Sequence, residues 1–347
     1  MATMSVPQVV APSGLPRTID WLGDHAVIID QTLLPGELRL LVVNTVDDMI
    51  DAIQRLAVRG APAIGVAGAL GVAIAAIVAE RDGYDASWVH SQADRIAVAR
   101  PTAVNLNWAV QRVRPFIESG AASVVAAAVQ VMADDIRDGA ALGERGANLV
   151  GELCGPLVNV QTHCNAGSLA CAEIGSALSL VRVLHQRGQL GTVHVDETRP
   201  LLQGARLTAY ELGALGIDYR VQVDGAGASA IRLGLVNCVI IGADRVAANG
   251  DVCNKVGSYP LALAAQRSGI PFIVAAPEST LDAKTLSGAD IKIEERAAEE
   301  VLRWGGIEIA PQGARAWNPA FDVTPADLVT AIVTESRVIR PSLGDRL

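Results

Sequence analysis

The 347-residue chain is poor in aromatic residues and has no CxxC motif, and each shortage argues against a class of protein. Aromatic residues make up 3% of the chain and the formal net charge is −9, which argues against a basic, base-stacking surface for nucleic acid. The five cysteines indicate neither a disulfide framework nor a zinc knuckle and fit a reducing, cytoplasmic location. Residues 1–17 lack a basic segment with a long apolar run, so no secretory signal is expected.

Half of the residues are hydrophobic, and the length corresponds to roughly two domains. Residues 61–79 carry no charge and are long enough to be considered as a membrane span. The stretch is mostly Ala and Gly, however, with Gly65, Gly68 and Gly71 at three-residue spacing. Because membrane insertion is driven mainly by Leu, Ile, Phe and Val, we expect a buried helix that allows close backbone approach.

The first half of the chain has mostly helical periodicity after a predicted strand at 38–43. Thr45 is expected to cap the first helix, with Asp48 at the capping-box position. Further helices are predicted at 61–79, 87–98, 104–117 and 123–153, the last interrupted by Gly139, Gly143 and Gly146. The domain junction is expected in this last segment.

The second half alternates short β-rich runs with helical patterns. Strands are predicted at 157–161, 192–195, 219–223, 238–241 and 272–275, with helices at 169–186, 205–215, 229–234 and 260–268. Such alternation produces parallel strands with right-handed crossovers. The predicted fold class is α/β, with an N-terminal, mostly helical domain with short strands (1–140) and a Rossmann-like, doubly wound parallel-sheet domain (141–347).

Polar residues follow each predicted strand, and ligands bind at the carboxyl ends of strands in such sheets. Cys164 follows the first strand beside an Asn-Ala-Gly turn, where it is either a small buried side chain or a functional thiol. His163 precedes it, but neighbours on an extended chain point to opposite faces, so a Cys-His pair is not expected. Asp244 ends an apolar strand, where burial would suit acid–base work, and an ion pair with Arg245 is the alternative.

Two further patterns each have a functional and a structural interpretation. Residues 225–230 have the form G-x-G-x-x-A after a predicted strand, the context of a dinucleotide site. The charge of Asp224, directly before the first glycine, argues against a bound pyrophosphate. Asn254 and Lys255 precede a predicted helix, where they could bind a phosphate or could lie on the surface.

Seven segments, spread over nearly the whole chain, form long motifs. They are 29–36 (IDQTLLPG), 59–65 (RGAPAIG), 100–106 (RPTAVNL), 162–167 (THCNAG), 196–206 (DETRPLLQGAR), 242–251 (GADRVAANGD) and 318–325 (NPAFDVTP). Together they closely resemble the methylthioribose-1-phosphate isomerase family of methionine salvage.

The resemblance implies an enzyme that converts 5-methylthioribose 1-phosphate into 5-methylthioribulose 1-phosphate, without a metal or redox cofactor. It implies Cys164 and Asp244 as the catalytic pair, with Asp244 as the proton donor and Cys164 supporting the transition state. The implied substrate contacts are Arg59, Gly60, Ala61, Arg100, Gln203, Asn254 and Lys255. It also implies a homodimer that acts on a small phosphosugar, with neither nucleic acid nor a membrane as a partner.

Two features differ from the pattern of this family: residues 224–227 (DGAG) and Glu278. Both follow predicted strands, where they could alter the pocket for the 5-methylthio group. Isomerisation of 5-deoxyribose 1-phosphate or of ribose 1,5-bisphosphate therefore stays open, and the second sugar would require more cations. A more distant resemblance to the regulatory subunits of translation initiation factor 2B leaves a non-catalytic role open, although Cys164 together with Asp244 favours an enzyme.

Overall fold

The computed structural model describes residues 14–100 and 104–347 and divides the chain into two units. Unit 1 is Met1–Arg137 with Gly167–Gly175, and unit 2 is Asp138–Ala166 with Ser176–Leu347. The division therefore falls within three residues of the boundary expected after residue 140. The return of Gly167–Gly175 to unit 1 has no counterpart in the sequence pattern.

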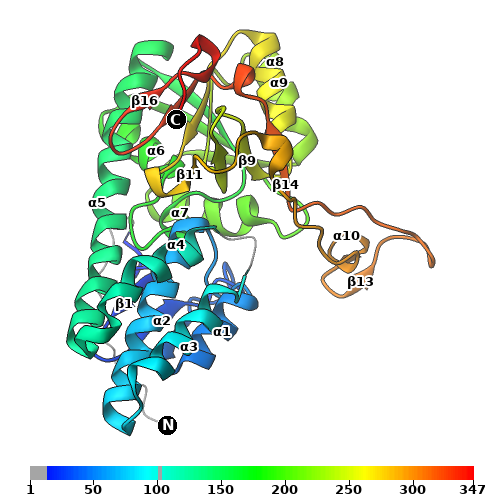
Figure 1. Cartoon of the computed structure of the whole chain (residues 1–347). Helices are drawn as coiled ribbons and strands as arrows, with labels where there is room; N and C mark the ends of the chain where they lie inside the picture. The colour runs from blue at the N-terminus through cyan, green and yellow to red at the C-terminus, as the bar shows by residue number, and fades with distance from the viewer. Residues whose placement is uncertain (1–13, 101–103) are drawn as a thin grey trace. The chain divides into compact units, whose positions relative to one another are not determined.

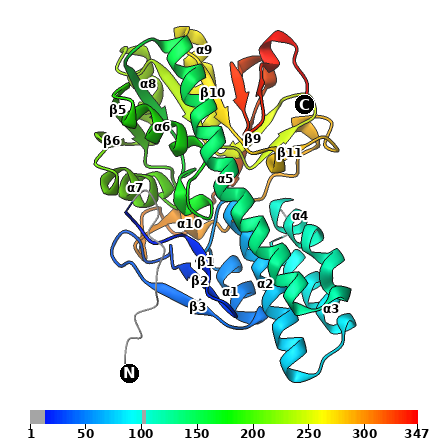
Figure 2. The ribbon, with the colours of Figure 1, turned by 90° about the vertical axis from the view of Figure 1, so that its left-hand side faces the viewer.

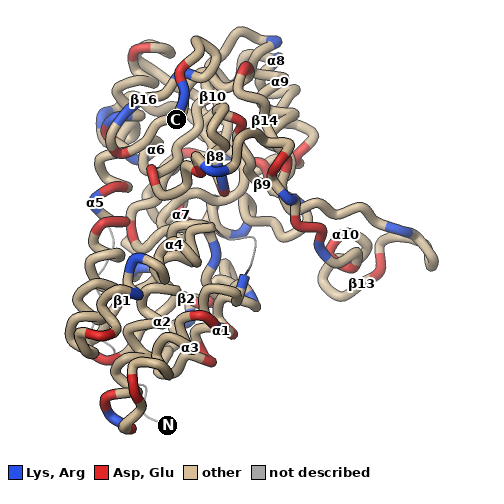
Figure 3. The backbone as a smooth tube through the Cα atoms, in the orientation of Figure 1, with Lys and Arg blue, Asp and Glu red and all other residues tan. Residues whose placement is uncertain are grey.

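Unit 1 is organised around α2 (Ala61–Asp82), which has no charged residue before Glu80 (Figure 3). A Cβ added at Gly65 would lie 3.0 Å from the carbonyl oxygen of Asn105, and one at Gly68 would lie 2.6 Å from Leu106 Cδ1. These glycines let α4 pack closely on α2, so the predicted close approach is confirmed. By length and composition α2 could cross a membrane, but 78% of its apolar window is buried, as in a core helix.

The other elements of unit 1 surround this helix. They are β1 (Ile19–Trp21), β2 (Ala26–Ile29), β3 (Leu40–Val43), α1 (Val46–Gln54), α3 (Ala86–Ala97), α4 (Val104–Val113) and the first half of α5 (Ala121–Cys154). The three strands form an antiparallel sheet in the order β1-β2-β3. Thr45 caps α1 by accepting a hydrogen bond from the Asp48 N–H at 3.1 Å, as predicted.

Helix α5 is continuous, and the interruption predicted at its glycines is wrong. A Cβ added at Gly143 would lie 2.9 Å from Ser179 Oγ, and one at Gly146 would meet the side chain of Leu180. The glycines therefore make room for α6 (Ala177–Gln186) in unit 2 instead of ending the helix. The boundary between the units lies inside α5.

Unit 2 contains a seven-stranded sheet in the order β16-β15-β10-β7-β4-β5-β6. Its strands are β4 (Val158–Thr162), β5 (Leu190–Asp196), β6 (Tyr219–Gln222), β7 (Cys238–Ile241), β10 (Phe272–Ala275), β15 (Ala331–Val333) and β16 (Val338–Ile339). All neighbours pair in parallel except β15 and β16. Without β16 this is the doubly wound order 3-2-1-4-5-6, which confirms the predicted fold class.

Helices cover both faces of this sheet (Figure 2). The second half of α5 and α6 pack in one apolar cluster, whereas α8 (Gly227–Arg232) and α9 (Ser258–Ser268) pack in the other. The predicted helix at 205–215 is a π-turn followed by α7 (Ala209–Ala214). The helix predicted at 169–186 begins only at Ala177, because the preceding Gly167–Gly175 segment belongs to unit 1.

The sequence patterns did not predict a second sheet in unit 2, in the order β11-β8-β9-β14 (Figure 1). It consists of β11 (Leu281–Asp282), β8 (Arg245–Ala247), β9 (Val252–Lys255) and β14 (Phe321–Thr324). The short helix α10 (Glu299–Leu302) and the hairpin β12 (Arg303–Trp304) and β13 (Ile307–Glu308) precede β14. Because β9 pairs with β14, residues far apart in the sequence lie side by side.

Candidate active site

Cys164 and Asp244 lie beyond the carboxyl ends of β4 and β7, the neighbouring strands at which the strand order of the sheet reverses. Crevices at this switch point are where doubly wound sheets bind ligands. The two loops are also in direct contact, because a Cβ added at Gly242 would lie 2.7 Å from the Cβ of Ala166. The sheet topology thus brings the predicted catalytic pair to the same edge.

The backbone of Cys164 is held in an unusual conformation. Its φ is 60°, a left-handed value that is costly for a non-glycine residue. The Cys164 N–H donates to Thr198 Oγ1 at 2.9 Å, and the Thr208 hydroxyl donates to the Cys164 carbonyl oxygen at 2.6 Å. Thr198 itself has a φ of 65°. Non-glycine residues with such φ values cluster at functional sites, where surrounding contacts hold them.

Asp244 is half-buried at the start of the segment that leads into β8. Its N–H donates to the carbonyl oxygen of Cys253 at 2.9 Å. Burial and the nearby charge of Asp244 raise the pKa of the Cys253 thiol to about 12. Arg245 lies 3.6 Å from Asp282 in an ion pair, so the guanidinium next to Asp244 in the chain has a carboxylate partner on β11.

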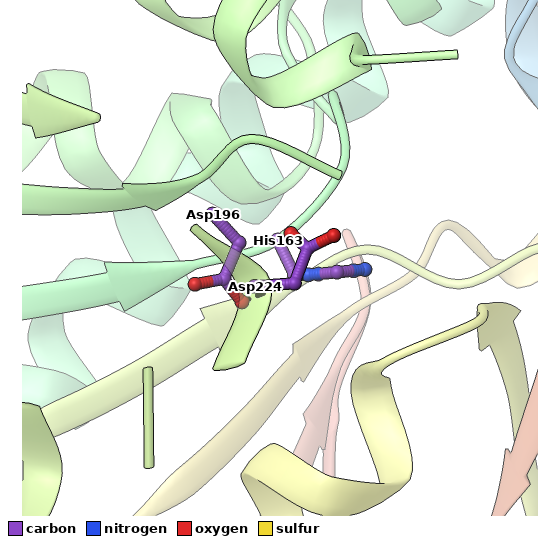
Figure 4. Close-up of side chains that lie close together, drawn as sticks. All are labelled: His163, Asp196 and Asp224. Carbon is purple, nitrogen blue, oxygen red and sulfur yellow. Dashed lines mark hydrogen bonds and ion pairs between the residues drawn. The ribbon is translucent and has the colours of Figure 1, made fainter. Parts of the chain in front are cut away.

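His163 takes part in a buried cluster with Asp196 and Asp224, whose potential ligand atoms lie within 4.8 Å of one another (Figure 4). His163 Nδ1 lies 2.9 Å from Asp196 Oδ2, and Nε2 lies 2.8 Å from the Val256 carbonyl oxygen. Asp224 accepts hydrogen bonds from the N–H groups of the two residues after Glu197. Both ring nitrogens and the Asp224 carboxylate are therefore engaged with this chain's own groups, which is not the arrangement of a metal site.

Packing within the protein explains Gly227, the second glycine of segment 225–230. A Cβ added at Gly227 would lie 2.8 Å from Leu261 Cδ2 and 3.0 Å from Asp196 Oδ1. Close approach of α8 to its neighbours therefore accounts for this glycine. The second glycine of the dinucleotide pattern thus has a structural reason of its own, whereas a Cβ added at Gly225 would meet nothing within 4 Å.

Asn254 and Lys255 end β9, and the helix that follows them does not offer a free N-terminus. Asp322 accepts hydrogen bonds from the Gly257 N–H at 2.7 Å and the Tyr259 N–H at 3.2 Å, where a phosphate would otherwise bind. Lys255 is buried, with Nζ 4.5 Å from the centre of the Phe321 ring. Any phosphate near Lys255 would thus rely on side chains and not on the amides of α9.

Gln203 is 7% exposed, and within the described ranges its Oε1 has no hydrogen-bond partner. A buried acceptor without a partner costs free energy unless a ligand or water satisfies it. This is an observation in favour of Gln203 as a ligand contact, as the sequence resemblance implies. Gln203 directly precedes the π-turn at Gly204–Thr208, which also carries Thr208.

The two departures from the family pattern have structural roles. Asp224 caps backbone N–H groups, as described above. Glu278 Oε1 accepts hydrogen bonds from the hydroxyl groups of Thr334 and Ser336 and from Arg337. Although burial alone would raise the pKa of Glu278, Arg337 and these hydroxyl groups hold it below its ordinary value. Both carboxylates thus bind groups of this chain.

The remaining predicted contacts belong to unit 1. Arg59 precedes α2, Gly60 is its N-cap, and Ala61 is its first residue. Gly60 has a φ of 90°, and a Cβ added there would lie 2.5 Å from the Ala170 carbonyl oxygen, so only glycine fits. Arg100 is half-buried and directly precedes residues 101–103, which lie outside the described residues.

The sequence patterns did not indicate three residues that form hydrogen bonds around this site: Thr198, Thr208 and Asp322. Thr198 lies in the polar run after β5, which was a usable signal. Thr208 and Asp322 lie in a helical pattern and a strand, where nothing local indicates a contact with the Cys164 loop or with α9.

The doubly wound fold, with candidate polar groups at its switch point, defines an α/β protein of the kind that binds small molecules there. The family model described as "Initiation factor 2 subunit family" matches residues 57–341. The chain belongs to this family, which bears out the resemblance noted in the sequence.

Curated relatives match over most of this chain. A Nocardia farcinica protein, named a probable bifunctional methylthioribose-1-phosphate isomerase/methylthioribulose-1-phosphate dehydratase, is 55% identical over 94% of this chain, which spans 60% of that relative. The methylthioribose-1-phosphate isomerase of Alkalilimnicola ehrlichii is 47% identical, covering 93% of this chain and 94% of the relative. The 5-deoxyribose 1-phosphate isomerase of Moorella thermoacetica is also 47% identical, with the same coverage.

Two solved structures have the same fold, but one is named as an enzyme and the other as an initiation factor. The 5-methylthioribose 1-phosphate isomerase of Pyrococcus horikoshii is 40% identical, with a TM-score of 0.85, covering 94% of this chain and 93% of that one. A structure named translation initiation factor eIF-2B, subunit delta, from A. fulgidus is 39% identical, with a TM-score of 0.82, covering 94% and 96%. The names alone therefore include both enzymes and an initiation factor.

Proposed function

We propose that this chain is an aldose–ketose isomerase that converts 5-methylthioribose 1-phosphate into 5-methylthioribulose 1-phosphate in methionine salvage. The observation that carries the proposal is the placement of Cys164 and Asp244 on touching loops at the switch point of the sheet. A regulatory protein needs neither a thiol nor a carboxyl group there. The names of relatives that are 47–55% identical support the same reaction.

The chemistry explains why a thiol and a carboxyl group are suited to this reaction. The phosphate on the anomeric carbon prevents the sugar ring from opening freely, so the ring oxygen must receive a proton as its bond to C1 breaks. A hydrogen then moves from C2 to C1 while the C2 hydroxyl group loses its proton and becomes the ketone, so one proton is taken up, one is released and no net oxidation occurs. We assign the proton donor to Asp244, because its half-buried position limits competition from water. We assign Cys164 to stabilising the transition state.

The substrate's phosphate is assigned to cationic and amide groups. Arg59, Gly60 and Ala61 stand at the N-terminus of a 22-residue helix, where backbone N–H groups and the helix dipole favour an anion. Arg100 would add a bidentate guanidinium contact. We assign Asn254, Lys255 and the amide of Gln203 to the remaining substrate oxygens, because the amide groups of α9 are bound by Asp322.

A second substrate, 5-deoxyribose 1-phosphate, is favoured by one observation, the 47% identity to the Moorella thermoacetica enzyme named for it. The two sugars differ only at C5, so the assigned groups serve both reactions. Ribose 1,5-bisphosphate would need a second anion site. The chain is further proposed to act as a cytoplasmic homodimer on a soluble phosphosugar, without a metal or redox cofactor and without nucleic acid or a membrane as a partner.

Phosphorus NMR of the protein with 5-methylthioribose 1-phosphate, without added cofactor, tests the proposal. The substrate phosphorus couples to one anomeric proton and gives a doublet, whereas the product phosphorus couples to two C1 protons and gives a triplet. We expect the doublet to give way to the triplet. A persistent doublet with folded protein rejects this substrate. Persistent doublets with 5-deoxyribose 1-phosphate and ribose 1,5-bisphosphate as well would favour the regulatory role.

A further inference from the structure

The ring of His163 is one of the most deeply buried ionisable groups in the described part of the chain, being 1% exposed, and the proposed chemistry does not use it. Both of its nitrogens face oxygen atoms that accept hydrogen bonds. Nδ1 is 2.9 Å from a carboxylate oxygen of Asp196 (Figure 4). Nε2 is 2.8 Å from the carbonyl oxygen of Val256. A neutral imidazole has one N–H and can donate only one of these bonds.

We propose that His163 is a positioning residue whose ring is doubly protonated in the active protein and joins the backbone beside Cys164 to the backbone beside Lys255. The proposal deepens the function proposed above and rests on it. One ring bond fixes the Cys164 loop to the end of β5. The other fixes the same loop to the turn between β9 and α9.

The contacts of the ring show why this link is rigid. A Cβ added at Gly257 would lie 2.7 Å from His163 Cε1, so the backbone of the turn packs directly against the ring. Gly257 has a φ of 110°, and its N–H is bound by Asp322. Asp196 is held in turn by Gln222, whose amide donates to Asp196 Oδ1 at 3.1 Å. The ring therefore bridges two supports that are themselves fixed.

The charges around the ring favour the protonated form. Asp196 at the end of β5, Asp224 after β6 and Asp322 on β14 are acidic, whereas Lys255 on β9 is a cation that interacts with Asp322. The N-terminal end of α9 contributes backbone N–H groups to the Asp322 carboxylate, and α8 contributes Gly227 beside Asp196.

Burial alone would lower the pKa of His163, but Asp196 and then Asp224 outweigh it and raise the pKa above its ordinary value. The competing arrangement places the shared proton on Asp196 and leaves the ring neutral. An imidazole is ordinarily a stronger base than an aspartate by more than two pKa units, so the ion pair is the expected form.

NMR of the full-length protein with ¹⁵N-labelled histidine tests the state of the ring directly. The chain has five histidines, and the variant His163→Gln identifies the His163 signals by their loss. At about pH 7.5, above the ordinary pKa of an exposed histidine, we expect both ring nitrogens of His163 to be protonated. A His163 ring with one unprotonated nitrogen at this pH overturns the inference.

Turnover tests the positioning role. We expect His163→Gln to lower kcat about tenfold or more at the pH optimum, whereas His185→Gln leaves it unchanged. The kcat of the wild type should fall at high pH with the pKa that NMR gives for His163. In Asp196→Asn, the high-pH fall in kcat and the NMR pKa of His163 should both move to lower pH. If the fall in kcat stays at the same pH while the NMR pKa of His163 moves, the positioning role is contradicted.

These outcomes separate this inference from the proposed function. A wild-type protein that turns over none of the three sugars refutes the proposed function and, with it, the positioning role. The NMR measurement needs no substrate and still decides whether the ring is doubly protonated. Normal turnover by the wild type and by folded His163→Gln refutes the inference alone.

Discussion

Gly242 and Ala166 are in such close contact that a Cβ added at Gly242 would lie 2.7 Å from the Cβ of Ala166. Ala166 follows Cys164 by two residues, and Gly242 precedes Asp244 by two. The absence of a side chain at Gly242 therefore sets how closely the loops after β4 and β7 approach. We expect the separation of the proposed catalytic groups to depend on this contact.

Replacing Gly242 by alanine is expected to push these loops apart. We expect kcat to fall at least about tenfold, since small displacements at a reacting centre are costly, and stability to fall by about 1–3 kcal/mol from overpacking. Steady-state kinetics and guanidinium denaturation measure the two effects. Gly213→Ala is the matched control, because its added Cβ would meet nothing closer than 3.7 Å. Unchanged kcat in Gly242→Ala would show that the loop contact does not set the catalytic geometry.

Cys164→Ser and Asp244→Asn should each abolish most of the turnover while the protein stays folded. Loss of a general acid typically costs about 10²–10⁴-fold in rate, and Asn is nearly isosteric with Asp. The phosphorus NMR assay measures turnover, and circular dichroism checks the fold. Cys171→Ser, at a buried cysteine of unit 1, is the control for loss of a thiol. Normal turnover in either catalytic variant would remove that residue's assigned role.

Gly60→Ala should destabilise unit 1 more than Gly83→Ala, although the two glycines flank the same helix with φ values of 90° and 80°. The left-handed backbone of Gly83, with a ψ of 22°, costs an alanine about 1–2 kcal/mol, and the positive-φ backbone of Gly60, with a ψ of 136°, lies outside that region and costs about 1–3 kcal/mol. Only at Gly60 would the new methyl group also meet the backbone of Ala170, at 2.5 Å, adding about 1–3 kcal/mol. Chemical denaturation of both variants measures the difference. Equal losses would mean that the contact with Ala170 relaxes freely.

Asp30 should stabilise the protein in a pH-dependent way. Burial would raise the pKa of this carboxyl, but the Thr32 hydroxyl at 2.6 Å and Arg55 at 2.9 Å outweigh it, so the pKa lies below its ordinary value. A depressed pKa means that the stabilisation is present above the unfolded-state pKa, near 3.9, and is lost as the pH falls through the folded-state pKa.

The variant Asp30→Asn is therefore expected to cost about 1–3 kcal/mol at pH 7 and progressively less at lower pH, approaching no difference below the folded-state pKa. Urea denaturation at a series of pH values from 7 to 3 measures it. Asp51→Asn removes the exposed partner of the same arginine and should change stability little at any pH. A loss in Asp30→Asn that does not vary with pH would contradict the ionic origin.

Local sequence signals predicted the long helices and the parallel strands and singled out Cys164 and Asp244, whereas their roles as a catalytic pair came from the family resemblance. The alternation of β-rich and helical runs predicted the parallel sheet, because each pattern is decided by neighbouring residues. Cys164 and Asp244 were found because they follow apolar strands, and the topology of a doubly wound sheet gathers strand ends. The Thr45 cap and the close packing at the glycines of α2 were also predicted correctly, because neighbouring residues indicate both.

Contacts between residues that are distant in the sequence decided the second sheet, the packing of several glycines and the partners of the polar groups. Asp322 occupies the N-terminus of α9, and β14 pairs with β9, although more than sixty positions separate them. The sequence pattern predicted breaks at the glycines of α5, whereas the structure shows that they make room for α6. The pattern also placed Gly227 in a nucleotide motif, whereas the structure packs it against Leu261 and Asp196. The sequence alone determined the parallel strands of the large sheet, the long helices and the polar residues that follow those strands, but not the second sheet of unit 2. Only tertiary packing decided which polar groups already have partners within the chain, because burial and hydrogen bonding depend on contacts that no local pattern encodes.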